Sequence, residues 1–335
     1  MSRVILPQSY SEKLDLYETQ MAIGRLKFLF QNALTETLNL KRVTAPLFVE
    51  PQTGLNDDLN GVERAVSFDI KETGTRVQIV HSLAKWKRMA LYRYHFQPGT
   101  GLYTDMNAIR RDEELDNFHS IYVDQWDWEK IITRQERTEA YLKETVRSIV
   151  RIIVDCAEQL QREFPALTVP LSRDVKFITT QELEDRYPAL SPRERENAAA
   201  KEYGTVFLMQ IGDKLRSGKP HDGRAPDYDD WKLNGDILFW DETMQCALEI
   251  SSMGIRVDEK ALDEQLSKSD CDYRRQLTFH KLLLAGKLPL TIGGGIGQSR
   301  LCMLILEKAH IGQVQVSVWD RETVNHCEAN GITLL

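Results

Sequence analysis

The chain has 335 residues, of which 42% are hydrophobic and 28% charged, and its formal net charge is −7 at pH 7. This composition excludes a disordered or fibrous protein, and the acidic balance argues against a large nucleic-acid surface, which needs clustered Lys and Arg. Five scattered cysteines without a Cys-x-x-Cys pair exclude a disulfide framework and a zinc site. No apolar run approaches the roughly 18 to 20 residues that span a bilayer, and the N-terminus lacks a signal peptide's apolar region, so a cytoplasmic protein is expected.

The first half of the chain begins with a helical pattern and continues with short strands. Residues 11–39 carry apolar side chains among charges at helical spacing, and Gly24 marks the place where this helix could break. The segment 43–49 has strand propensity, but Pro46 lacks a backbone donor and demotes it to an edge or interface strand. Strand-like runs follow at 65–70 and 76–80, and a helical pattern covers 83–94.

The second half combines one long helix with several consecutive strands. Residues 121–128 alternate large apolar and polar side chains, which predicts a half-buried strand whose outer face carries Gln125 and either Asp124 or Asp127. A helical pattern from 136 to 164 predicts a packing helix of roughly 40 Å. Further strand-like runs are 175–180, 206–211, 237–240 and 246–250, with a polar loop at 212–232. Strands adjacent in sequence favour an α+β fold with a mainly antiparallel sheet flanked by helices.

A glycine-rich run at 293–300, Gly-Gly-Gly-Ile-Gly-Gln-Ser-Arg, follows an apolar segment and opens a helical pattern. Glycine lets the backbone approach a phosphate or a nucleotide ring, and a helix N-terminus favours anions. The run lacks the Gly-Lys-Ser/Thr of a P-loop and the spacing of a Rossmann unit. A tight turn for close helix–sheet packing explains it equally well.

Two clusters suit phosphate and its counter-ion. Arg110 and Arg111 stand beside acids, and arginine binds phosphate through paired hydrogen bonds, although a solvated charge run is the alternative. Asp236, at the start of one strand, and Glu249, within another, suit Mg²⁺, which takes few protein carboxylates plus substrate oxygens. For Glu249 the alternative is a buried acid paired with an arginine.

Two further segments suit a substrate. Residues 81–88 place Ser82 and Lys87 at a strand-to-helix turn, where a lysine could bind a carboxylate or simply form a basic helix face. The polar loop at 221–231 mixes acids, aromatics and one arginine, which suits a substrate lid or a cation site, and a solvated loop is the alternative. No histidine forms a defensible catalytic pattern, and His119 is interpreted as a packing or hydrogen-bonding residue.

Taken in order, these segments resemble the three signature motifs of class II aminoacyl-tRNA synthetases, most closely the aspartate branch. The strand at Pro46 resembles the dimer-forming first motif, the segment from Arg110 to Glu113 with the following Trp-rich strand resembles the second, and 293–300 resembles the third. The similarity is closer still to ammonia-dependent asparagine synthetases (aspartate–ammonia ligases), whose characteristic stretches resemble 81–88, 122–128, 224–231, 251–256 and 293–300.

The resemblance implies one class II synthetase-like catalytic domain over 1–335, with an N-terminal helix at about 11–39, no anticodon-binding domain, and a homodimer formed through the Pro46 strand. It implies ATP-dependent amidation of L-aspartate by ammonia through a β-aspartyl-adenylate, with release of AMP and pyrophosphate. Arg110 would then hold the α-phosphate and Arg300 the γ-phosphate, while Asp236 and Glu249 carry Mg²⁺. The implied ATP site also includes Asp112, Gly293, Gly294 and Gly295.

One register stays open within this resemblance. Either Arg110 with Asp112 or Arg111 with Glu113 is the Arg-x-acid pair of the second motif, and we favour Arg110.

On the aspartate side, the resemblance implies that Lys87 binds a carboxylate of a substrate that lies reversed, because the β-carboxylate is activated. Only neutral ammonia attacks the adenylate, so a carboxylate must take a proton from ammonium, and Asp57 and Asp229 are the candidates. The other implied aspartate contacts are Ser82, Gln125, Asp124, Asp127, Ser252 and Arg256.

Three rival functions are weaker. A tRNA-charging synthetase needs an anticodon module, but only about 40 residues precede Pro46 and the chain is acidic, so no tRNA partner is expected. No membrane partner is expected either, since no apolar run is long enough to span a bilayer. A non-catalytic sensor would have lost a phosphate-binding arginine or a metal carboxylate, yet Arg110, Glu249 and Arg300 are present. A glutamine-dependent synthetase needs a nucleophilic cysteine, and residue 2 is Ser2.

Overall fold

The computed structural model describes residues 4–7, 10–57, 59 and 63–335. Helix α1 (Leu16–Leu38) begins with a capping box, in which Asp15 accepts the N–H of Glu18 at 2.8 Å and the Glu18 carboxylate accepts the N–H of Asp15 at 3.2 Å. The helix passes Gly24 without a break, because buried Ala22 and Leu26 anchor it on both sides. The helix predicted at 11–39 is therefore present and continuous.

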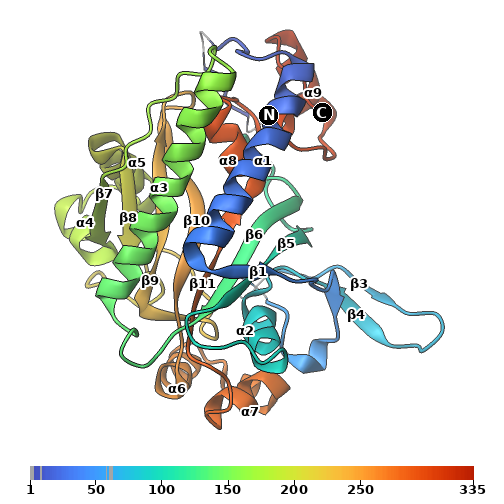
Figure 1. Ribbon diagram of the computed structural model, residues 1–335, viewed down its shortest axis with the longest axis vertical. Coiled ribbons are helices and arrows are strands. Elements are labelled where there is room, and N and C mark those ends of the chain that lie inside the picture. The colour runs from blue at the N-terminus through green and yellow to red at the C-terminus, as the bar shows by residue number, and fades with distance from the viewer. Residues whose placement is uncertain (1–3, 8–9, 58, 60–62) are drawn as a thin grey trace.

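An eight-stranded sheet in the order β1-β5-β6-β11-β10-β9-β8-β7 forms the centre of the molecule (Figure 1). Its two outermost pairs, β1–β5 and β7–β8, are parallel and the five pairs between them are antiparallel. The predicted α+β fold with a mainly antiparallel sheet is confirmed. The strands are β1 (Leu40–Arg42), β5 (Gly101–Ile109), β6 (Tyr122–Ile131), β7 (Val175–Thr179), β8 (Thr205–Met209), β9 (Asp229–Asp241), β10 (Cys246–Arg256) and β11 (Thr291–Gly297).

Helices α1 and α3 lie side by side across one face of this sheet (Figure 1). Phe30 of α1 packs on Trp126 of β6 with ring centroids 4.6 Å apart, so this face carries the main core. Helices α2, α6 and α7 gather at one end of the sheet, and the β3–β4 hairpin of a second sheet, β2-β4-β3, projects from the body (Figure 1). The smaller strands are β2 (Phe48–Val49), β3 (Ser67–Asp69) and β4 (Arg76–Ile79). The remaining helices are α2 (Ala84–Arg93), α3 (Glu139–Glu163), α4 (Thr180–Arg186), α5 (Pro192–Tyr203), α6 (Glu259–Lys268), α7 (Thr278–Leu284), α8 (Gln298–Ile305) and α9 (Arg321–Ala329), with 3-10 turns at Pro51–Thr53, Asp272–Gln276 and Ile311–Gln313.

Two sequence predictions differ from these bounds, and one strand was missed. The strand predicted at 43–49 is present only as β2 (Phe48–Val49), an edge strand of the second sheet, because Pro46 lies in the connection between β1 and β2. The polar loop predicted to reach 232 ends earlier, since β9 begins at Asp229 and buries its acidic start. Strand β5 was not predicted: it is buried along most of its length, so it lacks the alternation of a half-exposed strand.

The glycine run also differs from its interpretation as a junction, because 293–297 belong to strand β11 itself. These glycines pair with β10 on one side and β6 on the other, and none of them has a positive φ. Close approach of neighbouring side chains, not a turn, is therefore the reason for glycine here. Among the helices of the described ranges, none has both the length and the apolar character to span a bilayer.

Candidate active site

A cavity of about 340 Å³ lies on the sheet face away from α1. Along β6, Trp126 and Trp128 point into the core with Phe30, so alternation turns Gln125 and Asp127 into the cavity. Strands β10 and β11 supply the rest of the floor, and the walls come from α2, the segment after β5 and the loop before β9. The cavity is lined among others by Asp57, Ser82, Lys87, Arg110, Glu113, His119, Asp124, Gln125, Asp127, Arg224, Tyr228, Asp229, Glu249, Ser252, Arg256, Gly294, Gly295, Ser299, Arg300 and Gln315.

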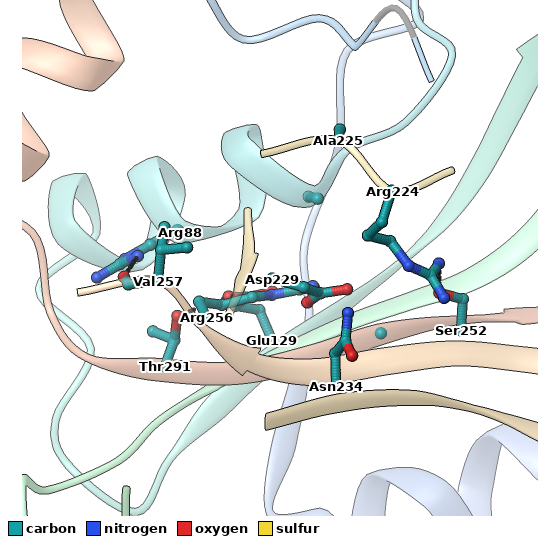
Figure 2. A network of polar contacts seen from close by, with 12 residues as sticks. Arg88, Glu129, Arg224, Ala225, Asp229, Asn234, Ser252, Arg256, Val257 and Thr291 are labelled. Carbon is teal, nitrogen blue, oxygen red and sulfur yellow. Dashed lines mark hydrogen bonds and ion pairs between the residues drawn. The ribbon is translucent and has the colours of Figure 1, made fainter. Parts of the chain in front are cut away.

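A buried ionic layer supports one end of the floor, and Figure 2 shows Arg256 lying between Glu129 and Asp229. Arg256 donates through Nε and Nη2 to Glu129 at 2.8–3.1 Å and through Nη1 to Asp229, while Thr291 Oγ1 donates to Glu129 at 2.7 Å. Burial by itself raises the pKa of Glu129, but the charges of Arg256 and Lys87 outweigh it and hold that pKa below its usual range. Arg256 is thus a rigid cation whose donors are largely engaged.

Lys87 lies next to this layer, fully buried on α2. Its ammonium donates to Asp127 and, at 3.0 Å, to the carbonyl of Gly294. An ammonium has three donors, so one N–H of Lys87 remains for a ligand in the described part of the site. Burial lowers the pKa of Lys87, and the nearby charge of Arg256 lowers it further, so an incoming carboxylate would favour the charged form.

The opposite half of the cavity carries two lightly engaged arginines. The Arg110 guanidinium has an ion pair with Glu113 at 3.8 Å. Arg300 contacts the carbonyl and the carboxylate of Glu249 at 3.2 and 3.4 Å. Each guanidinium has five N–H donors, so both retain donors for a bidentate anion. This half can bind phosphate.

Two carboxylates border the arginines. Asp236 accepts from Arg224 at 2.7 Å, and Arg224 also donates to Ser252 at 2.5 Å (Figure 2). Burial raises the pKa of Asp236, Arg224 opposes this effect and Glu249 adds to it, and the resulting pKa is about 7. Burial also raises the pKa of Glu249, but Arg300, Arg224 and Arg110 outweigh it and hold that pKa below its usual value.

The pair Asp236 and Glu249 fits a divalent cation. Two carboxylates that disfavour each other's charge gain from added positive charge, and Mg²⁺ takes few protein ligands. Within the ranges that the structure describes, no three metal-type side chains cluster, so a metal here would need substrate oxygens as well.

A third feature of the cavity is the side chain of Tyr228, which lines it together with Asp57 and Asp229. Burial raises the pKa of Tyr228, and the charges of Asp57 and Asp229 raise it further, which places all three groups close together. Asp57 is buried and accepts the N–H of Leu59 at 3.1 Å, while Asp229 pairs with Arg256. A small cation would find two carboxylates here.

The structure brings fourteen of the seventeen predicted site residues to the cavity wall. These are Asp57, Ser82, Lys87, Arg110, Asp124, Gln125, Asp127, Asp229, Glu249, Ser252, Arg256, Gly294, Gly295 and Arg300. Three others lie off the wall: Asp112 pairs with Arg64, Asp236 lies behind Arg224, and a Cβ on Gly293 would overlap the Glu129 carboxylate. Arg110 pairs with Glu113, which differs from both registers considered.

Sequence reasoning missed several wall residues. Arg224 and Tyr228 lie in the polar loop, where neither was named as a site residue, and Glu113 was assigned to the other arginine in one of the two registers. His119, interpreted as a packing or hydrogen-bonding residue, does bond to Asp116 at 2.8 Å and also lines the cavity. Ser299 belongs to the run at 293–300 but was not singled out within it, and Gln315 gave no signal, because a single glutamine has no chemistry-bearing spacing.

Comparison with known proteins agrees with this geometry. The family model "Aspartate-ammonia ligase" matches residues 17–331. An aspartate–ammonia ligase of Clostridium tetani is 59% identical over 334 residues, covering 99% of this chain and 98% of the relative, and one of Lactobacillus johnsonii is 59% identical over 99% of both.

Solved structures agree on the fold. An asparaginyl-tRNA synthetase of Pyrococcus horikoshii, solved with asparaginyl-adenylate, has a TM-score of 0.63 at 14% identity over 89% of this chain and 68% of that one. An aspartyl-tRNA synthetase of Entamoeba histolytica has a TM-score of 0.61 at 15% identity, over 91% and 59%. At these identities the likeness shows a class II synthetase catalytic fold.

Proposed function

Because this chain belongs to the aspartate–ammonia ligase family, we propose that its cavity holds aspartate over Lys87 and Arg256 and ATP over Arg110 and Arg300. The chain is an enzyme that makes asparagine from aspartate, ammonia and ATP. The residue roles that follow are our proposal for how this cavity performs that reaction.

The observation that carries the proposal is the division of cations within one cavity. Arg256 is locked by buried carboxylates at one end, whereas Arg110 and Arg300 keep most of their donors at the other. A cation that is held in place by carboxylates, such as Arg256, suits a small substrate that must be oriented. Arginines with spare N–H donors, such as Arg110 and Arg300, suit the negatively charged triphosphate of ATP. The two halves meet at β10 and β11, where the reacting atoms would lie.

On the aspartate side, the free N–H of Lys87 binds the α-carboxylate and leaves the β-carboxylate directed towards Arg110. Gln125, Ser82 and Ser252 line the same end and can hold the amino and carboxylate groups. Asp127 keeps Lys87 in place, so its contribution to aspartate binding is partly indirect.

The chemistry then proceeds in two displacements. A β-carboxylate oxygen attacks the α-phosphorus while Arg110 stabilises the charge on the phosphate, and pyrophosphate leaves with Arg300 on its terminal phosphate. Ammonium loses a proton to Asp57 or Asp229, and the neutral ammonia attacks the β-carbonyl carbon of the adenylate. The C–O bond to AMP then breaks and the nitrogen loses a second proton to the departing phosphate, which gives asparagine and AMP.

Mg²⁺ would be held by Glu249 and Asp236 together with phosphate oxygens, and it would neutralise charge on the leaving pyrophosphate. Its support is the charge coupling between these two carboxylates. Asp236 would have to turn from Arg224 towards the metal.

The assembly that we propose is a homodimer in the cytoplasm, without a tRNA partner. Its support is an exposed apolar row on α1, where Tyr17, Met21 and Phe28 are 73%, 48% and 54% exposed at helical spacing. Leu47 and Phe48, which follow Pro46, are also exposed, at 50% and 41%. We also propose that residues 1–335 act as one catalytic unit.

The test is a direct assay of purified protein with aspartate, ATP, Mg²⁺ and ammonium. We expect AMP and asparagine in equal amounts, both dependent on ammonium, with glutamine a poor substitute. Absence of ammonium-dependent AMP release, or charging of tRNA with aspartate instead, would overturn the proposal.

A further inference from the structure

Helix α8 begins at the cavity without a cap of its own. Its N-cap residue is Gly297, which has no side chain to accept the free N–H groups of the first turn. A carboxylate from β6 takes that place: Asp124 Oδ1 accepts the backbone N–H of Ser299 at 3.1 Å and its hydroxyl at 2.6 Å, across 175 positions of sequence. The start of this helix is therefore defined by a tertiary contact.

The capping carboxylate is itself held on several sides. Lys27 of α1 donates to Asp124 Oδ2 at 3.3 Å, and Gln315 donates to Asp124 Oδ1 at 3.4 Å and to Ser299 Oγ at 3.0 Å. Asp124 is 8% exposed, and a negative charge at a helix N-terminus is favourable. These donors already use the carboxylate, so Asp124 has little capacity left to bind the ends of aspartate.

Arg300 is the next residue after the one that Asp124 caps. Among the residues that the structure describes, its guanidinium contacts Glu249 alone, at 3.2 and 3.4 Å, so the direction of its side chain depends on how the first turn of α8 is fixed. We propose that Asp124 is a positioning residue for Arg300, which it orients towards the γ-phosphate by capping α8. This inference rests on the role proposed above for Arg300.

The distinguishing measurement compares two nucleotides. Only ATP carries the phosphate that Arg300 contacts, so Asp124→Ala should weaken ATP binding about tenfold, the size expected for loss of a helix cap, and leave AMP binding unchanged. Calorimetry with Mg²⁺ measures both dissociation constants, and steady-state assays should show a raised KM for ATP with an unchanged KM for aspartate. Asp69→Asn is the control, because it removes an exposed strand carboxylate that has no side-chain hydrogen bond to the described residues, and it should change neither constant.

Milder variants guard against misfolding. Asp124→Asn keeps an oxygen acceptor for Ser299 but loses the charge that pairs with Lys27, so about a threefold loss of ATP affinity is expected. Ser299→Ala keeps the backbone N–H and removes only the hydroxyl, with a similar small loss. Equal weakening of ATP and AMP in these variants, or a raised KM for aspartate alone, would overturn the inference.

A double substitution separates this inference from the function on which it rests. If Asp124 acts through Arg300, Asp124→Ala should cost no further ATP affinity in an Arg300→Ala background. If Arg300→Ala leaves ATP binding unchanged, the proposed role of Arg300 fails. If it weakens ATP binding but Asp124→Ala does not, or the effect of Asp124→Ala persists undiminished in the double variant, only the positioning role fails.

Discussion

At the scale of single residues, the number of ion pairs that a charged side chain already makes distinguishes residues that support the fold from residues that are available to bind substrate. Arg256 and Arg110 are both cavity arginines, yet the first is bound to two buried carboxylates and the second has one ion pair at 3.8 Å. Removing Arg256 would leave Glu129 and Asp229 unpaired, so its loss would disturb the fold as well as activity. Arg110 offers the cleaner functional test.

Arg110→Ala should abolish aspartate-dependent pyrophosphate exchange, by at least about a hundredfold, because it removes charge stabilisation at the α-phosphate. Arg111→Ala is a matched control, since Arg111 is the exposed neighbour on the same segment. The fold of both variants is checked by circular dichroism. If only Arg111→Ala stops the exchange, the register that we favour is wrong.

The two candidate acids for binding ammonium, Asp57 and Asp229, can be distinguished by which KM value their substitution raises. Asp57→Asn should raise the KM for ammonium about tenfold and leave the KM for aspartate unchanged, since it loses one charged hydrogen bond. Asp229→Asn also removes the partner of Arg256 and should raise both KM values. An unchanged KM for ammonium in Asp57→Asn would rule out this role for Asp57.

At the scale of elements, the β9–β10 turn contains a buried carboxyl group, Asp241, whose ionisation destabilises the fold. Asp241 accepts the N–H groups of Thr243 and Met244 at 2.8 and 3.1 Å, but its Oδ2 has no hydrogen-bond partner in the described ranges. Burial raises the pKa of Asp241 to about 6, against these two hydrogen bonds. Because the pKa of Asp241 is higher in the folded state than in the unfolded state, its protonation stabilises the fold. This stabilisation is fully present below pH 3.8, the pKa in the unfolded chain, and is lost as pH rises through 6.

Asp241→Asn keeps the acceptor for the turn and cannot ionise. Relative to the unsubstituted protein, its free energy of unfolding should therefore rise by about 1–3 kcal/mol between pH 4 and pH 7. Urea unfolding at several pH values measures this difference, with Asp69→Asn as the exposed control. A difference that is constant with pH would contradict the buried ionisation.

At the scale of the whole molecule, the face of α1 opposite the core is the largest clue to assembly. Tyr17, Met21 and Phe28 repeat on one side of a helix whose other side is fully buried. Lys27, beside Phe28, donates to Asp124, so the helix of the proposed subunit contact also bonds to a residue that lines the cavity.

Phe28→Asp should convert the proposed dimer into a monomer, because an interface that buries Phe28 would bury an unpaired charge in each subunit. Light scattering after gel filtration measures the mass. Tyr273→Asp is the control, since Tyr273 is 66% exposed on a different element. A dimer that survives Phe28→Asp would exclude this row as the contact.

Much of the site could be predicted because short segments carry their own chemistry. The run at 293–300, the Trp-rich strand and the charged stretch around Arg110 each contain residue types at a spacing that local geometry preserves. Strand alternation alone placed Gln125 opposite Trp126. The prediction left both Asp124 and Asp127 open, and only contacts from α2 and α8 distinguish them.

The sequence by itself determined the fold class, because the periodicity of helices and strands survives folding unchanged. Its resemblance to aspartate–ammonia ligases supplied the carboxylate-activating chemistry and most of the residues that meet in the cavity. The tertiary structure alone decided which charges are paired. Glu113 rather than Asp112 faces Arg110, Arg224 lies in front of Asp236, and β11 holds its glycines against Glu129 and Gln125. Such pairings join strands and loops far apart in the chain, and their geometry depends on how the sheet brings those segments together.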